Sequence, residues 1–164
     1  MRRLVWLTVL ACMLAAPAAG FALAGDVDGT LSVKAGIGKV YLNFNGSAVG
    51  RVQRGSILVT DPVAGDGIGF DFSNCDVEKD RTETTSFCRG TNLHFRAIGG
   101  KYQILVRGAG IYLSAVGRGQ AALDGRGEYP TVDSDGAYSL NDGPYKSLPN
   151  FGLILSLSPP SGGA

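Results

Sequence analysis

From about residue 30 onward, apolar and polar residues alternate in short runs that glycine separates. A period of two places successive side chains on opposite faces, as in a strand of an antiparallel sheet that buries one face. No window shows the 3.6-residue period of an amphipathic helix. We expect strands in the ten runs with this character: residues 30–35, 39–45, 57–59, 70–72, 93–97, 102–107, 111–115, 121–123, 137–140 and 153–157.

Glycine marks the boundaries of these runs. The chain has 25 glycines in 164 residues, which is about twice the usual share. Asn45-Gly46 and Ile98-Gly99-Gly100-Lys101 have the composition of tight hairpin turns. Short strands with closely spaced turns predict one all-β domain, an antiparallel sandwich or flattened barrel. A hydrophobic content of 45% argues against disorder.

One short segment recurs along the chain. Residues 48–53 read AVGRVQ, and residues 115–120 read AVGRGQ. A decayed duplication accounts for this echo, and so does chance in a chain rich in Gly, Val and Ala. Each copy is followed by a short apolar run and an aspartate, Asp61 or Asp124, and we expect Arg51 and Arg118 each to pair with the aspartate of its own half.

The N-terminal segment has the three parts of a secretory signal peptide. Arg2 and Arg3 precede an apolar run over residues 4–16, and Ala22-Leu23-Ala24 forms a small-residue cleavage site. The apolar run is shorter than the roughly 20 residues that a membrane span needs. Residues 1–24 are therefore predicted to be a cleaved signal peptide. A weaker alternative is a lipoprotein signal that ends at Cys12.

Cleavage leaves an exported chain with one domain over residues 25–158 and a flexible tail over residues 159–164. Without Arg2 and Arg3, 13 of the 15 Lys and Arg residues remain against 14 Asp and Glu, a formal charge of −1. This balance gives no basis for binding nucleic acid or an anionic membrane, which needs a clustered basic face. No second long apolar run is present, so we expect no transmembrane span.

The exported part contains two cysteines, Cys75 and Cys88. An even number of cysteines in an exported protein predicts a disulfide. The twelve residues between them are mostly charged or hydroxylated, so we expect a solvated loop. The spacing does not match a redox motif, and a zinc site would need more ligands.

Few residues are suited to catalysis. The only histidine, His94, lies in an alternating run, where we expect it to point away from the buried side chains of Leu93 and Phe95. No nucleophile elbow, dinucleotide-binding motif or phosphate-binding loop is present. We predict no catalytic residue and no cofactor. A pair of carboxylates for glycoside hydrolysis stays open, because sequence does not show which acids meet in space.

One segment has weak metal-binding character. Asp133, Asp135 and Asp142 are calcium candidates because Ca²⁺ prefers oxygen ligands. The full EF-hand pattern is absent, and Asp-Gly turns around a strand over residues 137–140 explain the same residues. We therefore assign no metal site.

Tyrosines offer a possible ligand platform. Tyr41 and Tyr112 have the opposite parity to the main apolar residues of their runs, so both should point outward. The other tyrosines after residue 24 are Tyr102, Tyr129, Tyr138 and Tyr145. Outward tyrosines can stack on sugars, and they are also ordinary residues of strands.

The pattern AVGRG at residues 115–119, with DGAYSLNDGPY at residues 135–145, resembles small glycine-rich exported bacterial β proteins of no assigned function. The resemblance extends over most of the exported chain. It implies an all-β fold and brings no catalytic or binding residues with it.

These observations predict an exported, non-enzymatic structural or interaction protein of the cell envelope or extracellular space. Its expected partner is an envelope protein or a glycan. The first alternative is a sandwich or barrel that binds a small apolar ligand or a glycan, and the second is a carboxylate-based hydrolase. An outward aromatic and apolar patch would favour an interaction protein. An interior cavity would favour a protein that binds a small ligand. Two acids that converge in a cleft would favour an enzyme.

Overall fold

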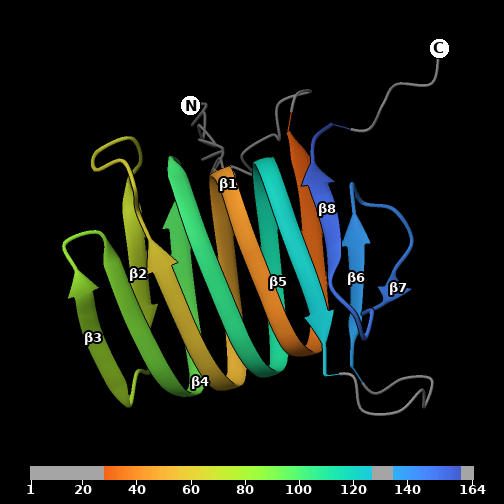
Figure 1. The fold of residues 1–164 in the computed structure, drawn as a ribbon, viewed down its shortest axis with the longest axis horizontal. Coiled ribbons are helices and arrows are strands. Elements are labelled where there is room, and N and C mark those ends of the chain that lie inside the picture. Colours follow the sequence, from red (N-terminus) through yellow and green to blue (C-terminus); the bar gives the residue numbers. More distant parts are fainter. Residues whose placement is uncertain (1–27, 127–134, 160–164) are drawn as a thin grey trace, which may run out of the picture.

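The structure is a computed structural model that describes residues 28–126 and 135–159. The predicted signal peptide and residues 160–164 of the predicted tail lie outside this part. The described chain is all-β and antiparallel, as the sequence predicts (Figure 1). Its strands are β1 Gly29–Thr60, β2 Gly69–Ser73, β3 Val77–Thr82, β4 Thr85–Ile98, β5 Lys101–Gly125, β6 Ala137–Leu140, β7 Lys146–Ser147 and β8 Leu153–Leu157.

The long strands correct the prediction of many short ones. Three expected runs lie within β1, and three more lie within β5. The glycines between these runs bend the strand without ending it, because hydrogen-bonded pairing between β1 and β5 continues through the bends. The hairpin predicted at Asn45-Gly46 is wrong, since Gly46 lies inside β1. Gly99 and Gly100 connect β4 to β5, but those strands pair with β1 and not with each other.

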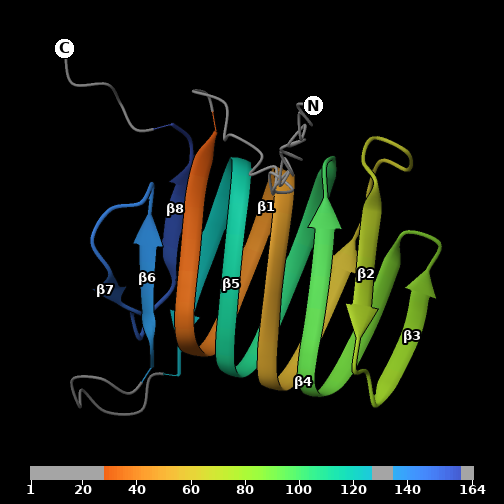
Figure 2. The same cartoon turned by 180° about the vertical axis from the view of Figure 1, so that it is seen from behind.

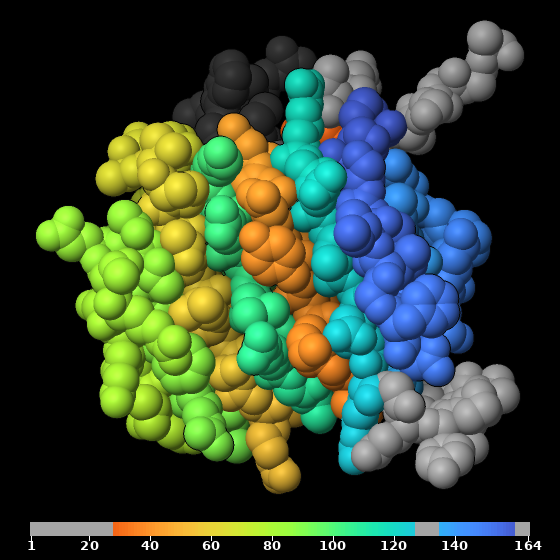
Figure 3. Space-filling model, in the orientation of Figure 1, coloured from red at the N-terminus to blue at the C-terminus, as the bar shows by residue number. Residues whose placement is uncertain are grey.

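Bending folds the sheet into two layers (Figures 1 and 2). β1 and β5 pass repeatedly from one layer to the other, so their segments alternate across each layer. Tyr41 of β1, for example, pairs with Leu105 on one side and with Ala122 on the other, both from β5. Layer A, in front in Figure 2, contains β6, β1 31–34, β5 111–117, β1 47–54, β4 91–98 and β2. Layer B, in front in Figures 1 and 3, contains β8, β5 119–123, β1 39–45, β5 101–107, β1 56–60, β4 85–89 and β3.

A row of glycines forms one edge of this sandwich. Cross-strand register places them in the order Gly90, Gly55, Gly108, Gly38 and Gly125. We call these residues the glycine row. Gly38, Gly55, Gly90 and Gly108 are each at or next to a point where a long strand turns from one layer to the other, and Gly125 is the last residue of β5. The sandwich edge therefore consists of strands that bend together at matched positions, so the ladder between them is preserved.

The core fills the space between the layers. Tyr102 is its largest fully buried side chain, and its hydroxyl donates a hydrogen bond to the carbonyl oxygen of Ile98 at 3.5 Å. Fully burying one Val, Leu, Ile or Phe side chain stabilises the fold by about 1.5–3 kcal/mol. The core also includes Leu31, Val40, Leu42, Phe44, Val52, Ile57, Leu93, Phe95, Ile104, Val106, Ile111, Leu123 and Leu157.

The disulfide joins Cys75, two residues after the end of β2, to Cys88 in the first part of β4. Cys75 and Cys88 are bridged with an S–S distance of 2.05 Å and a Cα–Cα distance of 5.5 Å, and Cys88 is fully buried. The segment between them is a hairpin of β3 and β4 and not the loop that the sequence suggested. All six residues of β3 are exposed, so the expectation of a solvated segment was correct while its secondary structure was wrong.

Candidate functional site

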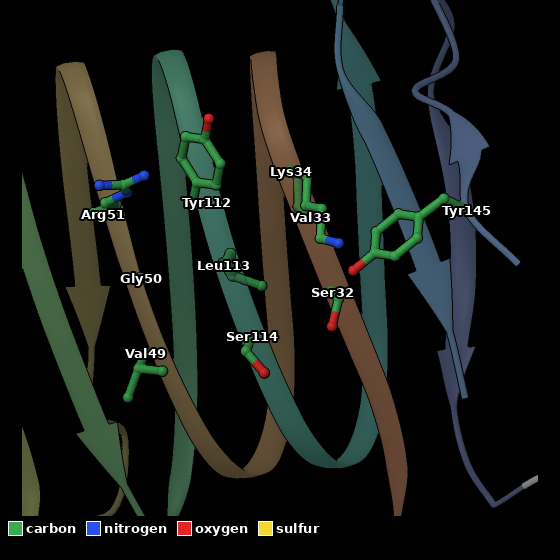
Figure 4. A pocket seen from close by; sticks show the side chains of 10 residues that line it. All are labelled: Ser32, Val33, Lys34, Val49, Gly50, Arg51, Tyr112, Leu113, Ser114 and Tyr145. Atoms are coloured by element: carbon green, nitrogen blue, oxygen red, sulfur yellow. The ribbon is translucent and has the colours of Figure 1, made fainter. Parts of the chain in front are cut away.

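The candidate site is an open hollow on the outer surface of layer A. It has a volume of about 430 Å³ and lies over three neighbouring strand segments, two from β1 and one from β5. We call it the Tyr112 hollow. Its lining residues are Ser32, Val33, Lys34, Val49, Gly50, Arg51, Tyr112, Leu113, Ser114 and Tyr145 (Figure 4).

Two tyrosine rings in the hollow each lie against a cation. The guanidinium carbon of Arg51 is 4.3 Å from the centre of the Tyr112 ring, and the ammonium nitrogen of Lys34 is 4.0 Å from the centre of the Tyr145 ring. Figure 4 shows the two pairs at opposite ends of the hollow. Each ring attracts its cation through the negative face of its π system. The rings therefore hold both cations in place while the hydrogen-bond donors of the cations stay available.

The floor of the hollow is formed by Val33, Gly50 and Leu113, which lie on the core-facing side of their strands. Val33 and Leu113 are buried below the surface, and Gly50 is opposite Phe95 on one side and Leu113 on the other. A Cβ at Gly50 would lie 2.5 Å from Cε1 of Phe95. Gly50 thus makes room for the Phe95 ring in the core.

One side of the hollow carries hydroxyl groups. Ser32 and Ser114 are directly opposite each other in cross-strand register, and Val49 lies beside Ser114 on the next strand. Val49 is 47% exposed although it is apolar. None of the ten lining residues is acidic. The hollow thus combines apolar surface, aromatic rings, hydroxyl groups and two positive charges.

A β-bulge positions Lys34. The register between β1 and β5 shifts between Val33 and Gly36, and Ala35 has a φ of 51°. An extra residue in one strand of a pair bends that strand and redirects a side chain. The bulge places Lys34 at the surface beside β6, where it pairs with Ala137 in register and reaches Tyr145.

The structure confirms part of the prediction about tyrosines. Tyr41 and Tyr112 point outward, each between buried neighbours, but on opposite layers. Of these two, Tyr112 lines the hollow and Tyr41 does not. Tyr145, from the segment between β6 and β7, is the second tyrosine in the lining. Tyr102 and Tyr138 are buried, while Tyr129 lies outside the described residues.

The expected pairing of the echoed arginines is wrong. Arg51 lies over Tyr112, and the Nε atom of Arg118 is 3.5 Å from a carboxylate oxygen of Asp28, an aspartate before the first strand. The echoed segments are paired with each other: Ala48 is opposite Ala115 in register. Sequence order could not show this pairing, because it depends on how β1 and β5 fold back along each other.

His94 is exposed, and its neighbours Leu93 and Phe95 are buried, as the sequence predicts. In register, His94 is opposite Arg51 on one side and Ser73 on the other. It is not among the residues that line the hollow.

Two of the three calcium candidates, Asp135 and Asp142, are among the described residues. Asp133 lies outside them, and no group of three or more acidic, histidine or cysteine residues suited to a metal ion occurs in the described part. Asp142 belongs to a tight turn after β6 in which Asn141 and Asp142 have φ values of 51° and 54°. Asn141 accepts a hydrogen bond from the backbone nitrogen of Thr30 at 3.0 Å. The turn therefore has a structural role, as the alternative explanation from sequence proposed.

Two further hollows lie along the glycine row. One, of about 680 Å³, is lined by three arginines together with Asp76. The other, of about 400 Å³, contains Asp124, whose carboxylate is 3.0 Å from the ammonium group of Lys39. Neither of them, nor the Tyr112 hollow, brings two carboxylates together among its described residues. These three sites therefore give no support to a two-carboxylate hydrolase.

Comparison with known protein families, with curated proteins and with solved structures finds no match. The residues that the structure describes include no helix long and apolar enough to cross a membrane.

Proposed function

We propose that this chain is an exported, non-enzymatic interaction protein that binds an acidic saccharide chain in the Tyr112 hollow. The observation that carries the proposal is the pair of tyrosine rings, Tyr112 and Tyr145, each with a cation at its face. Aromatic rings stack on the apolar faces of sugars, and arginine and lysine bind carboxylates.

The shape of the hollow favours a chain over a small enclosed ligand. The hollow is open to solvent and extends over three strand segments, whereas sites for small apolar ligands enclose most of the ligand surface. Ser32 and Ser114 can donate hydrogen bonds to sugar hydroxyls on one side. Val49 and the two tyrosine rings provide the apolar contact surface.

The charge of the hollow favours an acidic sugar. Lys34 and Arg51 line it without an acidic residue beside them in the lining set. Arg51 is held by Tyr112, so fewer rotamers of its side chain are lost when a ligand binds. A uronic acid placed over the floor could meet one cation at either end.

The extracellular location rests on the signal-peptide pattern of residues 1–24 and agrees with the Cys75–Cys88 disulfide. The intact mass of the protein secreted by its host tests it. We expect a chain that starts at Gly25 or nearby. A mass that retains residues 1–24, or adds a lipid on Cys12, contradicts this location.

Isothermal titration with a galacturonic acid tetrasaccharide and an N-acetylglucosamine tetrasaccharide tests the binding site. We expect the acidic probe to bind more tightly. Tyr112→Ala should weaken its binding by at least tenfold, because it removes the ring and the support for Arg51. Tyr41→Ala is the matched control, since Tyr41 is an outward tyrosine on the opposite layer.

The proposal is wrong if neither probe binds, or if Tyr41→Ala weakens binding as much as Tyr112→Ala. Arg51→Gln separates charge from stacking. It should weaken binding of the acidic probe and leave the affinity for the neutral probe within twofold of the wild-type value.

A further inference from the structure

The strongest feature outside the Tyr112 hollow is the hollow of about 680 Å³ at the glycine row, which contains three arginines: Arg54, Arg89 and Arg107. We call it the arginine hollow. Its arginines are far apart in sequence, and each directly precedes a member of the glycine row. Gly55, Gly90 and Gly108 meet at the bend. Arg89 and Arg107 therefore lie on one side of it, and Arg54, whose strand runs antiparallel to theirs, lies on the other side, opposite Thr91.

Cross-strand register shows how closely two of these arginines approach. Ser56 is directly opposite Arg89 on one side and Arg107 on the other. Neighbouring strands are about 4.8 Å apart, so the two arginine backbones are separated by about 10 Å. Two guanidinium groups at that separation can reach the same tetrahedral anion. The hydroxyl groups of Ser56 and Thr91 add donors to the same hollow.

These three arginines form no ion pair at 4.0 Å or less within the described part of the chain. There, the ion pairs at 4.0 Å or less are Lys39 with Asp124 and Arg118 with Asp28, and neither involves the three arginines. Asp76 is the one carboxylate among the residues lining the hollow. Like charges held together raise the free energy of the protein, and a bound anion would lower it. Arginine binds phosphate oxygens in a bidentate geometry.

A row of apolar side chains lies beside the arginine hollow on the outer surface of layer B, the layer that Figure 3 shows from outside. Five of its six residues are each two positions along the strand from a member of the line Arg89, Ser56, Arg107, Lys39 and Asp124, so they point to the same side as that line. The sixth, Ile154, is opposite Ala122 in register. Cross-strand register connects the apolar row continuously: Phe87, Leu58, Leu105, Tyr41, Ala122 and Ile154. Ile154 is 71% exposed.

Positive charge beside apolar surface fits one class of ligand better than a soluble anion. A phospholipid surface presents phosphate groups next to acyl chains, and proteins bind such surfaces through basic residues combined with apolar ones. We propose that the arginine hollow binds the phosphate group of an anionic phospholipid and that the apolar row contacts the same membrane surface. The arginine hollow lies at the glycine row, the apolar row lies on layer B, and neither shares a lining residue with the Tyr112 hollow, so each proposal can fail independently.

Co-sedimentation of the disulfide-bonded protein with phosphatidylglycerol vesicles tests this inference, with phosphatidylcholine vesicles as the reference. We expect binding to phosphatidylglycerol that weakens with added salt, and little binding to phosphatidylcholine. One basic residue near an anionic membrane changes the partition coefficient by about fivefold. Arg107→Gln should therefore lower partitioning by about fivefold.

Two further variants keep the test decisive. Ser56→Asp keeps all three arginines and places a carboxylate between Arg89 and Arg107, so it should block binding without lowering the melting temperature. Arg96→Gln removes one positive charge from layer A, where Arg96 is opposite Asp71 in register, and should change partitioning less than twofold.

Equal binding to both kinds of vesicle would overturn the inference. So would a loss with Arg96→Gln as large as the loss with Arg107→Gln. Arg107-dependent binding of glycerol phosphate in solution, without binding to vesicles, would also overturn it, because the ligand would then be a soluble phosphate.

Discussion

Gly55 of β1 and Gly108 of β5 are directly opposite each other where both strands bend from one layer to the other. A Cβ built on Gly55 would lie 2.0 Å from the carbonyl oxygen of Arg107, and one built on Gly108 would lie 2.2 Å from the carbonyl oxygen of Arg54. Each backbone occupies the space that a side chain on the other would need. The two strands can bend together only because both residues lack a Cβ.

Gly55→Ala should destabilise the fold by about 2–4 kcal/mol, because the contact is with backbone and cannot be relieved by a side-chain rotation. Urea denaturation measures the change. Gly152→Ala is the matched control, since a Cβ there meets no atom within 4 Å, and it should change stability by about 0.5 kcal/mol or less. Equal effects of the two substitutions would contradict this account of the bend.

Loss of the disulfide should lower stability by about 2–4 kcal/mol. The bridge joins cysteines 13 positions apart, and Cys88 is fully buried, so Cys88→Ser also places a hydroxyl in the core. Cys75→Ala with Cys88→Ala separates the two contributions because it removes the bridge without adding a polar group. Thiol labelling of the unfolded, unreduced wild type should be close to zero, and two reactive thiols per chain would show that the bridge is absent.

His94→Gln should change the free energy of unfolding by about 0.5 kcal/mol or less, because His94 is exposed. A denaturant titration measures this, and a screen of hydrolase substrates run in parallel measures activity. Turnover in the wild type that disappears in a stable His94→Gln variant would contradict the non-enzymatic interpretation.

Alkaline pH should destabilise the protein through Tyr102. Burial, and then the negative charges of Asp61 and Asp66, raise the pKa of Tyr102 above its ordinary value of 10.0. The unfolded chain therefore releases this proton at a lower pH than the folded chain. The stabilisation is complete below pH 10 and decreases as the pH rises from 10 through the folded pKa.

Denaturation curves between pH 8 and about pH 11 test this dependence on Tyr102. Tyr102→Phe should make the decrease shallower than in the wild type, because the titrating group is gone. The same slope in both proteins would show that other groups cause the alkaline loss of stability.

The inward or outward direction of side chains was predictable from sequence, because the period of two persists within each strand. His94, Tyr41 and Tyr112 all point outward as expected. Strand length was not predictable from local pattern. A glycine such as Gly46 or Gly55 is compatible both with a turn that ends the strand and with a bend that continues it. The bend depends on a glycine at the opposite position of the partner strand. Gly117 is opposite Gly46, and Gly108 is opposite Gly55.

The binding surfaces were harder to predict for a related reason. The net charge of the chain after residue 24 gave no sign of a basic surface, yet the dipeptide Arg-Gly occurs at residues 54–55, 89–90 and 107–108. Once the glycines are known to align at one edge, the three arginines must lie at that edge too, Arg89 and Arg107 on one side of the glycine row and Arg54 on the other. The three Arg-Gly pairs were visible in the sequence, but only the register between β1, β4 and β5 shows that they lie at the same edge of the sandwich.

The interleaving of β1 and β5 also has a consequence for how the chain folds. The central segment of β1 around Tyr41 acquires both neighbours only when β5 is present up to Ala122, about eighty residues later in the chain. Structures dominated by contacts between distant residues have high contact order and fold slowly. A chain crossing a membrane from its N-terminus would thus have no completed sheet behind it until most of it had emerged. The architecture itself would delay folding until translocation was nearly complete.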